Sequence, residues 1–325
     1  MLTCQFCNLM GTAEDGSFQV DQFNAGFWCE DCDGYTYLND QTTRHKFTLI
    51  LEDKDMNERR TVPPTIKLSK QLSPYRYPGG KSKLIEYLYS HLQQAKNKKL
   101  VSPFTGGGSF ELAMLDAGIV EHLHLNDLDT GVYSLWWLIK YMPFALIDRI
   151  QSKEPTHKEF FRAQSIIKQD YKGIDVVDAA WASLIVNRLA YSGIYKANPL
   201  GGKNGTNKNL LSRWNPKTLV KRIDHLHSLS DRMTITQLNA CELIEEAYWD
   251  SESTLFIDPP YVKKGKELYH CYYSEKDHRE LSQLLNLLHM GMPGADLIVT
   301  YDYNEWINQL YDYPVREVIG RTYSC

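Results

Sequence analysis

The chain has 325 residues, a formal net charge of −4 and an ordinary globular balance of 43% hydrophobic and 23% charged residues. This length allows one large domain or two modest ones, and the slightly acidic charge excludes a protein that is polycationic as a whole. No apolar run approaches the ~18 residues that a membrane span needs. Residues 1–4 lead straight into polar sequence rather than a signal peptide, so we expect a cytoplasmic protein.

Two pairs of cysteines characterise the first 38 residues: Cys4 with Cys7, and Cys29 with Cys32. The pairs are separated by 21 residues, and two such knuckles have the ligand number and spacing of one tetrahedral four-cysteine zinc site. A segment this short buries little core, so a structural zinc ion would be its main source of stability. Disulfides and free thiols are the alternatives. Residues 1–38 are therefore predicted to form a zinc-ribbon-like module with a small β-ribbon at 18–28.

A polar segment and a glycine turn follow this module. We interpret residues 39–70 as a linker that contains one strand at 46–51. Tyr77, Gly79, Gly80 and Lys81 then precede a helix whose apolar residues at 84, 85, 88 and 92 have helical spacing. A Gly-Gly turn that opens a helix, with a lysine at its start, favours anions.

A strand, a glycine loop and a helix come next, at 100–104, 105–109 and 110–117. This order is typical of the nucleotide-binding start of a doubly wound sheet, and the glycines let the backbone approach a ligand closely. A second strand at 122–125 ends in Asn126 and Asp127, and an acid about 20 residues after the loop is placed to bind a ribose hydroxyl pair. The spacing does not fit a dinucleotide or triphosphate loop. A purely structural glycine turn is the alternative.

The segment 150–230 is predicted to be helical and basic, and it separates the first strands from a later one. It holds no Asp or Glu between positions 179 and 223. A local basic surface on an acidic chain suits nucleic acid, although a solvated basic face has the same composition. The basic residues of this stretch are Arg188, Lys196, Lys203, Lys208, Arg213, Lys217, Lys221 and Arg222.

The most informative motif is Asp258-Pro259-Pro260-Tyr261, which follows a short apolar strand at 254–257. Ligands of open α/β sheets bind at the carboxyl ends of strands, and Pro-Pro stiffens the chain there. The Asp258 and Pro259 acceptors suit an exocyclic amine, and the aromatic ring suits a flat heterocycle. A strand-end turn with a capping Asp is the alternative. A helix at 275–289, a strand at 296–301 and a helix at 304–310 complete the alternation that predicts a parallel sheet.

Together these motifs resemble one family, the Dam-type (D12 class) N6-adenine-specific DNA methyltransferases, over residues 75–325. The resemblance implies an α/β fold: a Rossmann-like methyltransferase sheet with a helical target-recognition insertion, here with a small N-terminal zinc ribbon added. It places the methyltransferase domain at 71–325 and the insertion at about 150–250. The matching motifs, in order, are Tyr77-Pro78-Gly79-Gly80-Lys81, Pro103-Phe104-Thr105-Gly106-Gly107-Gly108-Ser109, Asn126-Asp127-Leu128-Asp129, Asn187-Arg188 with Gly193, Ser212-Arg213-Trp214-Asn215 and Asp258-Pro259-Pro260-Tyr261.

The resemblance also implies roles for these residues, with S-adenosyl-L-methionine (AdoMet) as methyl donor. Asp258 would accept a hydrogen bond from the adenine N6 amine and border the cofactor, Pro259 would supply the second acceptor, and Tyr261 would stack on the flipped-out base beside Pro260. Asp127 would bind the ribose. The other cofactor-binding residues would be Tyr77, Lys81, Phe104, Gly106 and Gly108. Double-stranded DNA would be contacted by Arg188, Tyr195, Lys196, Arg213, Trp214 and Asn215.

Two departures from the family pattern stand out. Ser102 occupies the place before Pro-Phe where the family usually has an acid, so a carboxylate expected near the positive end of AdoMet is missing. A strand at 315–319 stands where the family continues into a β-hairpin. The leading interpretation is an adenine methyltransferase of a restriction-modification system, a phage or a solitary type, in a bacterial or phage-infected cell. The alternatives are an RNA N6-adenine or DNA N4-cytosine methyltransferase, or a non-catalytic relative whose zinc module binds nucleic acid or a partner.

Overall fold

The computed structural model describes residues 45–54, 66–76, 79–92, 98–262, 265–291 and 293–320, together with the backbone of short strands within the first 44 residues. The chain divides into two compact units, Met1–His45 and Lys46–Cys325. The first unit contains a two-stranded and a three-stranded antiparallel sheet, and the predicted β-ribbon is present as β3 and β4. Its strands are β1 (Leu2–Thr3), β2 (Met10–Gly11), β3 (Phe18–Asp21), β4 (Gly26–Cys29) and β5 (Gly34–Tyr37).

The second unit is built on a seven-stranded sheet with the order β12-β6-β11-β10-β7-β8-β9. Every neighbouring pair in it is parallel. The predicted parallel α/β sheet is therefore confirmed. Its strands are β6 (Phe47–Asp53), β7 (Lys99–Ser102), β8 (His122–Asn126), β9 (Met233–Thr236), β10 (Ser253–Ile257), β11 (Asp296–Asp302) and β12 (Val315–Gly320).

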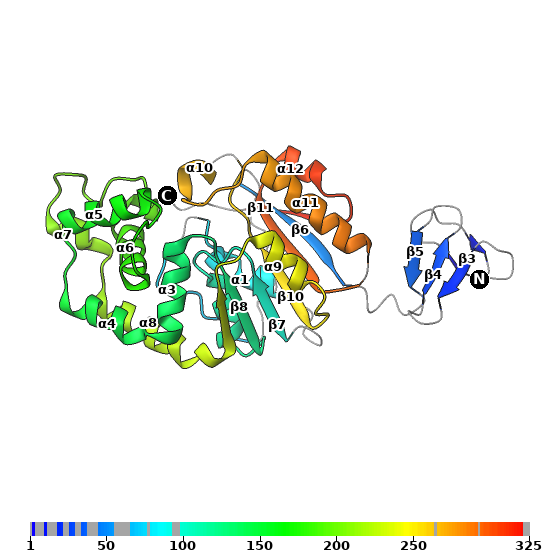
Figure 1. The fold of residues 1–325 in the computed structure, drawn as a ribbon, viewed down its shortest axis with the longest axis horizontal. Coiled ribbons are helices and arrows are strands. Elements are labelled where there is room, and N and C mark those ends of the chain that lie inside the picture. The colour runs from blue at the N-terminus through cyan, green and yellow to red at the C-terminus, as the bar shows by residue number, and fades with distance from the viewer. Residues whose placement is uncertain are drawn as a thin grey trace. The chain divides into compact units, whose positions relative to one another are not determined.

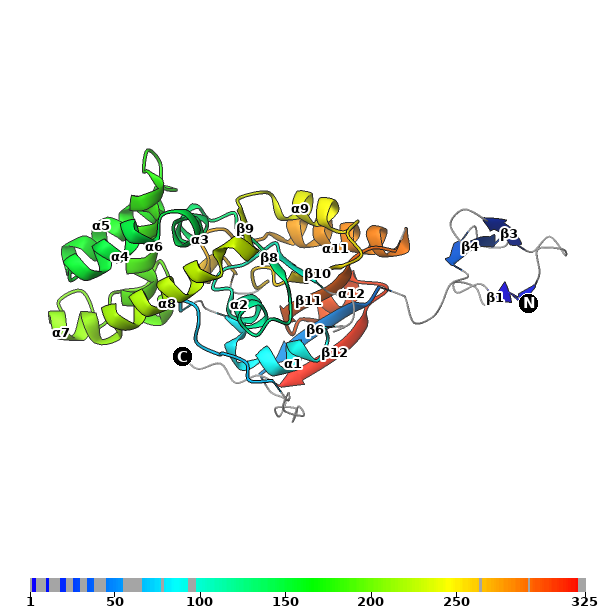
Figure 2. The same ribbon diagram turned by 90° about the horizontal axis from the view of Figure 1, so that it is seen from below.

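Helices cover both faces of this sheet (Figures 1 and 2). Side chains alternate along a strand, so Leu49 and Leu51 of β6 pack into one apolar cluster and Ile50 into the other. This is why the central strands are apolar throughout rather than alternating. The helices of one face are α1 (Ile85–Tyr89), α2 (Ser109–Asp116) and α3 (Thr130–Tyr141), and those of the other are α9 (Ala240–Ala247), α11 (Glu275–Met290) and α12 (Glu305–Leu310).

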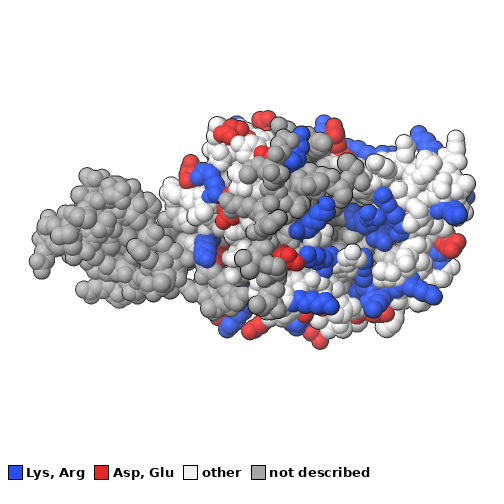
Figure 3. All heavy atoms as spheres, turned by 180° about the vertical axis from the view of Figure 1, so that it is seen from behind, with Lys and Arg blue, Asp and Glu red and all other residues white. Residues whose placement is uncertain are grey.

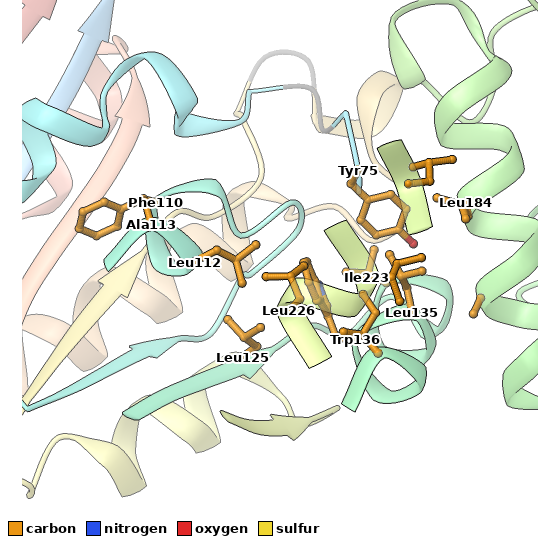
Figure 4. Packing of buried hydrophobic residues seen from close by; sticks show 14 of the residues in the cluster. Tyr75, Phe110, Leu112, Ala113, Leu125, Leu135, Trp136, Leu184, Ile223 and Leu226 are labelled. Carbon is orange, nitrogen blue, oxygen red and sulfur yellow. The ribbon is translucent and has the colours of Figure 1, made fainter. Parts of the chain in front are cut away.

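A helical region extends beyond the β9 edge of the sheet, next to α3 (Figure 2). Its helices begin at capping residues, such as Asp175, whose carboxylate accepts from the backbone N–H of Asp178. One apolar cluster runs without interruption from Phe110 and Leu112 through Trp136 to Leu184 and Ile223 (Figure 4). The helical region therefore shares the core of the sheet instead of folding around its own. Its helices are α4 (Pro143–Ser152), α5 (His157–Lys168), α6 (Val176–Leu189), α7 (Asn207–Leu210) and α8 (Pro216–Ser228).

Short helical turns complete the second unit. Within the described residues, no helix is long and apolar enough to cross a membrane. The turns are η1 (Lys81–Lys83), η2 (Tyr191–Gly193), η3 (Leu211–Arg213), η4 (Ser230–Arg232) and α10 (Gly265–Leu268).

Two parts of the sheet differ from what the sequence indicates. Strand β6 was expected in a linker at 39–70, yet it is an internal strand of the sheet, between β11 and the edge strand β12. The strand predicted at 315–319 is β12, and β6 is its parallel partner. The sequence indicated the strand but no partner for it. Strand β9 and helix α9 belong to the methyltransferase sheet although they fall inside the predicted insertion at 150–250. At four residues, with mostly half-buried side chains, β9 offers no apolar run to recognise.

Candidate active site

The strand order reverses between β7 and β10, because the chain proceeds from β7 outward to β8 and from β10 outward to β11. The loops that follow β7 and β10 diverge at this point and open a crevice at the carboxyl ends of the strands. A cleft of about 900 Å³, open to solvent, lies there. The predicted site residues that line it are Lys81, Phe104, Gly106, Gly108, Asp127, Asp258 and Pro260.

The glycine loop forms one wall of the cleft. Gly106 and Gly108 have φ angles of +48° and +58°, a conformation that favours glycine, and Gly108 directly precedes α2. A side chain of α3 holds the loop in place, because the Trp136 indole N–H donates to the Gly106 carbonyl at 3.1 Å. Phe104 packs edge-on against Tyr273, with ring centroids 5.2 Å apart. Backbone atoms of the loop are thus held at the surface of the cleft.

Asp127 links this loop to the end of β8. Its Oδ2 accepts from the Gly106 N–H at 2.7 Å, and its Oδ1 accepts from the Asp129 N–H at 3.0 Å. Burial raises the pKa of Asp127 to about 7, and the nearby Asp129 carboxylate acts in the same direction, while the two backbone donors oppose the rise. Each carboxylate oxygen keeps lone-pair capacity for a further donor, so this side chain can accept bonds from ligand hydroxyl groups.

Asp258 takes part in a buried ion network at the end of β10. Its Oδ1 lies 2.6 Å from the Lys81 ammonium and accepts from the Thr300 hydroxyl at 2.7 Å. Lys81 is only 3% exposed, and Glu52, at the carboxyl end of β6, lies 2.9 Å from the same ammonium. Within the described part of the chain, Asp258 Oδ2 accepts no hydrogen bond. The network therefore fixes one oxygen of Asp258 and leaves the other for a ligand.

The two prolines and Tyr261 differ in how they are exposed to the cleft. Pro259 is buried and Pro260 lines the cleft. Tyr261 is 6% exposed and packs edge-on against Tyr269, with ring centroids 6.0 Å apart. Its hydroxyl would come within 2.6 Å of a Cβ added at Gly79, so glycine is required there. Tyr77 lies outside the described residues.

Several cleft residues were missed by the sequence analysis. Glu111 of α2 is 3% exposed and lines the cleft, and its Oε1 accepts from the Ser102 hydroxyl at 2.7 Å. The sequence feature that could have revealed Glu111 is an acid in a helix whose other residues from Phe110 to Leu115 are apolar and buried. Glu52 does not line the cleft but pairs with Lys81, which does, and it follows an apolar run of β6 in the same way as Asp127 and Asp258 follow theirs. Tyr269, Tyr272 and Tyr273 also line the cleft.

The structure gives three of the six residues predicted to contact DNA a part in the fold itself. Arg188 is 7% exposed and donates to the carbonyls of Pro74 and Arg213 at 3.4 and 3.1 Å. Burial lowers its pKa to about 10, helped by the neighbouring Arg222, Arg76 and Arg213. Trp214 is buried in the apolar core. Asn215 caps α8 by accepting from the Thr218 N–H at 3.0 Å.

The remaining three lie nearer the surface. Tyr195 is half-buried beneath Lys196, whose ammonium lies 5.0 Å from its ring centroid and donates to the Lys266 carbonyl. Arg213 is half-buried. Lysine and arginine side chains gather over the helical region on the face that Figure 3 shows. Within the stretch 179–223 of this region, the exposed lysines are Lys196, Lys203, Lys208, Lys217 and Lys221.

The structure describes only one of the four predicted zinc ligands, and that one only by its backbone. Cys4, Cys7 and Cys32 lie outside the described residues, and Cys29 is described only as the last backbone position of β4. Among the side chains that are described, no cluster of three or more His, Cys, Asp or Glu is arranged to hold a metal ion.

Comparisons with known proteins agree with this geometry. The sequence model of the D12 class N6 adenine-specific DNA methyltransferases matches residues 77–319, more than half of the chain. The Type II methyltransferase M.MjaIII of Methanocaldococcus jannaschii is 23% identical over 275 residues, which cover 77% of this chain and 92% of that protein. The DNA adenine methylase of Vibrio cholerae is 27% identical over 198 residues, or 60% of this chain and 67% of its own. The Type II methyltransferase M.CviBI of Paramecium bursaria Chlorella virus NC1A is 22% identical over 241 residues, or 73% and 85%.

Proposed function

Because this chain belongs to the D12 class of N6 adenine-specific DNA methyltransferases, whose activity is AdoMet-dependent methylation of adenine in DNA, we propose that Asp258 and the Pro259 carbonyl hold the adenine N6 amine at the mouth of the cleft. This assignment rests on Asp258 Oδ2, which accepts no hydrogen bond among the described residues and can therefore accept one from the amine. Its partner oxygen is already bonded to Lys81 and Thr300, so the carboxylate cannot turn away from an incoming amine. An amine that donates to two fixed acceptors directs its lone pair away from both of them.

The cleft also has the chemistry that AdoMet requires. AdoMet supplies an electrophilic methyl group on a sulfonium, which the amine lone pair attacks. Its adenosine part suits Asp127, which can accept from ribose hydroxyls, and the glycine loop, which permits close approach. Among the described residues that line the cleft, the acids are Glu111, Asp127, Asp129 and Asp258, whereas Lys81 is the single Lys or Arg. A cleft with this excess of carboxylates suits a cationic cofactor.

The basic face of the helical region is our candidate for the DNA-binding surface. Phosphate contacts from Lys and Arg provide most of the affinity of such surfaces, and exposed lysines are present over α6 to α8. We retain Tyr195, Lys196 and Arg213 as candidate contacts with a short double-stranded site, and we give Arg188, Trp214 and Asn215 supporting roles. The target adenine must leave the duplex to reach Asp258. Since Tyr261 is buried, stacking of that base on it requires Tyr269 to move.

Transfer of labelled methyl groups tests this function. The full chain is incubated with labelled AdoMet and either double-stranded DNA or RNA, and the nucleic acid is then digested to nucleosides. We expect the label in N6-methyladenine from DNA. Label in N4-methylcytosine or only in RNA would support the alternative methyltransferases, and no transfer to any substrate would support a non-catalytic relative.

We also propose that Cys4, Cys7, Cys29 and Cys32 hold one structural zinc ion. Their number and spacing support it. Elemental analysis of protein purified in reducing, chelator-free buffer should find one zinc per chain, and metal-free protein would refute the site. Deletion of residues 1–38 should leave AdoMet affinity unchanged and weaken the binding of DNA or of a partner.

A further inference from the structure

Glu111 is an acid that the matched motifs do not assign. It lies in the first turn of α2, directly after the glycine loop, with its side chain in the wall of the cleft. The Ser102 hydroxyl at the end of β7 donates to its Oε1 at 2.7 Å. Ser102 is itself fully buried, and its carbonyl accepts from the Thr105 hydroxyl at 3.1 Å. The carboxyl group is thus held in one orientation by the loop that forms the cleft.

Among the described residues, no Lys or Arg forms an ion pair with Glu111. Lys81 is the one Lys or Arg among the described cleft residues, and its ammonium lies within ion-pair distance of Glu52 and Asp258. In the described part of the chain, Glu111 forms no salt bridge. A buried carboxylate without a paired cation is costly, and a cationic ligand in the cleft would stabilise it.

We propose that Glu111 receives the positively charged methionine end of AdoMet and replaces the carboxylate that Ser102 removes from the end of β7. The proposal rests on the cofactor assignment made above and adds a residue to it. Ser102 and Glu111 act as a pair in this arrangement: the small hydroxyl side chain leaves room for the longer acid from α2 and orients it. The sulfonium and the ammonium of AdoMet are the cationic groups that such a carboxylate can stabilise.

Cofactor binding then depends on pH. Burial, and next the Asp258 carboxylate, raise the pKa of Glu111 to about 7, while the Ser102 hydroxyl and Lys81 oppose the rise. A bound cation lowers that pKa, so Glu111 loses a proton as AdoMet binds, and affinity rises with pH up to about 7 and is constant above. Asp127 also lines the cleft and has a pKa raised to about 7. It would release a proton of its own when the ribose hydroxyls donate to it.

Calorimetry with two ligands separates the contributions of Glu111 and Asp127 to proton release. 5′-Methylthioadenosine has the adenine and the ribose of AdoMet but neither cationic group, so it reports Asp127 alone. Both ligands are titrated into the full chain at pH 7 in phosphate and in Tris, whose different ionisation heats give the protons released. We expect AdoMet to release about half a proton more than methylthioadenosine. Glu111→Gln should abolish that difference and weaken AdoMet roughly ten- to a hundredfold, while methylthioadenosine affinity changes less than about threefold.

Two further variants complete the test. Glu245→Gln alters an exposed acid of α9 and should change nothing. Ser102→Ala removes the donor to Glu111 and should shift the pH dependence of AdoMet binding upward, which keeps the proposal testable if Glu111→Gln fails to fold. Unchanged AdoMet affinity and proton release in Glu111→Gln would overturn the role of Glu111 and leave the methyltransferase assignment standing. Wild-type protein that binds neither ligand would overturn both.

Discussion

The cleft and the helical region use charge in opposite ways. In the cleft, acids and one lysine are buried or half-buried and held by bonds of 2.6–3.0 Å, as for Asp258 with Lys81 and Asp127 with the glycine loop. In the helical region, the lysines of the stretch 179–223 are exposed, and this stretch holds no acid. An acidic cleft suits a small cation in one orientation, and an exposed basic surface suits a polyanion in many registers.

The largest effect that this contrast predicts comes from Asp258. Asp258→Ala should lower methyl transfer by about a thousandfold or more, because the amine loses its charged acceptor, while AdoMet affinity changes little. Methyl transfer is measured with labelled AdoMet, and AdoMet binding by calorimetry. Asp258→Asn, which keeps the shape, should be almost as inactive. Activity of Asp258→Ala within a few-fold of wild type would remove Asp258 from the amine site.

The second effect concerns the contribution of the Lys81 ion network to the free energy of unfolding. Glu52→Gln leaves the buried Lys81 ammonium with one carboxylate instead of two, and breaking a buried pair costs about 3 kcal/mol in free energy of unfolding. Glu252→Gln is the matched control, because the Lys98–Glu252 pair has a similar separation of 3.0 Å but half-exposed side chains, and such pairs contribute about 0–1 kcal/mol. Urea unfolding of both variants gives the comparison. Equal losses would mean that burial does not set the strength of the Lys81 network.

The sequence predicted the cleft better than the helical region for a physical reason. Motifs such as Gly106 with Gly108, Asp127 and Asp258 stand at strand ends, where backbone geometry fixes what a side chain can reach. Arg188 lies in α6 and Trp214 in the short turn between η3 and α8. In both places an arginine or tryptophan side chain can turn to the core or to solvent, and only tertiary packing decides. Packing also decided the place of Glu52. The polar sequence around β6 favoured a linker, whereas pairing with β11 and β12 buries the strand.

The third effect separates cofactor binding from chemistry. Asp127→Ala should weaken AdoMet by about 1.5–3 kcal/mol, the scale of charge-assisted hydrogen bonds, because the ribose hydroxyls lose their acceptor. The Gly106 N–H loses its partner as well, so Asp127→Asn serves as the control that keeps an acceptor for it. Calorimetric titration of AdoMet provides the measurement. Wild-type affinity in the alanine variant would exclude Asp127 from the ribose site.

The smallest effect belongs to the basic face and is best seen through its dependence on salt. Lys217→Gln with Lys221→Gln removes two exposed charges from α8 without touching the core. If both contact phosphates, the slope of log affinity against log salt concentration should become less steep by about 2, since each contact contributes about 0.9. Fluorescence anisotropy with duplex DNA between 50 and 200 mM salt measures this slope. Lys98→Gln with Lys276→Gln removes two exposed charges outside α4–α8, and this control should leave the slope unchanged. An unaltered slope in the α8 variant would place the DNA elsewhere on the molecule, and a change in AdoMet affinity would show that the two regions are not independent.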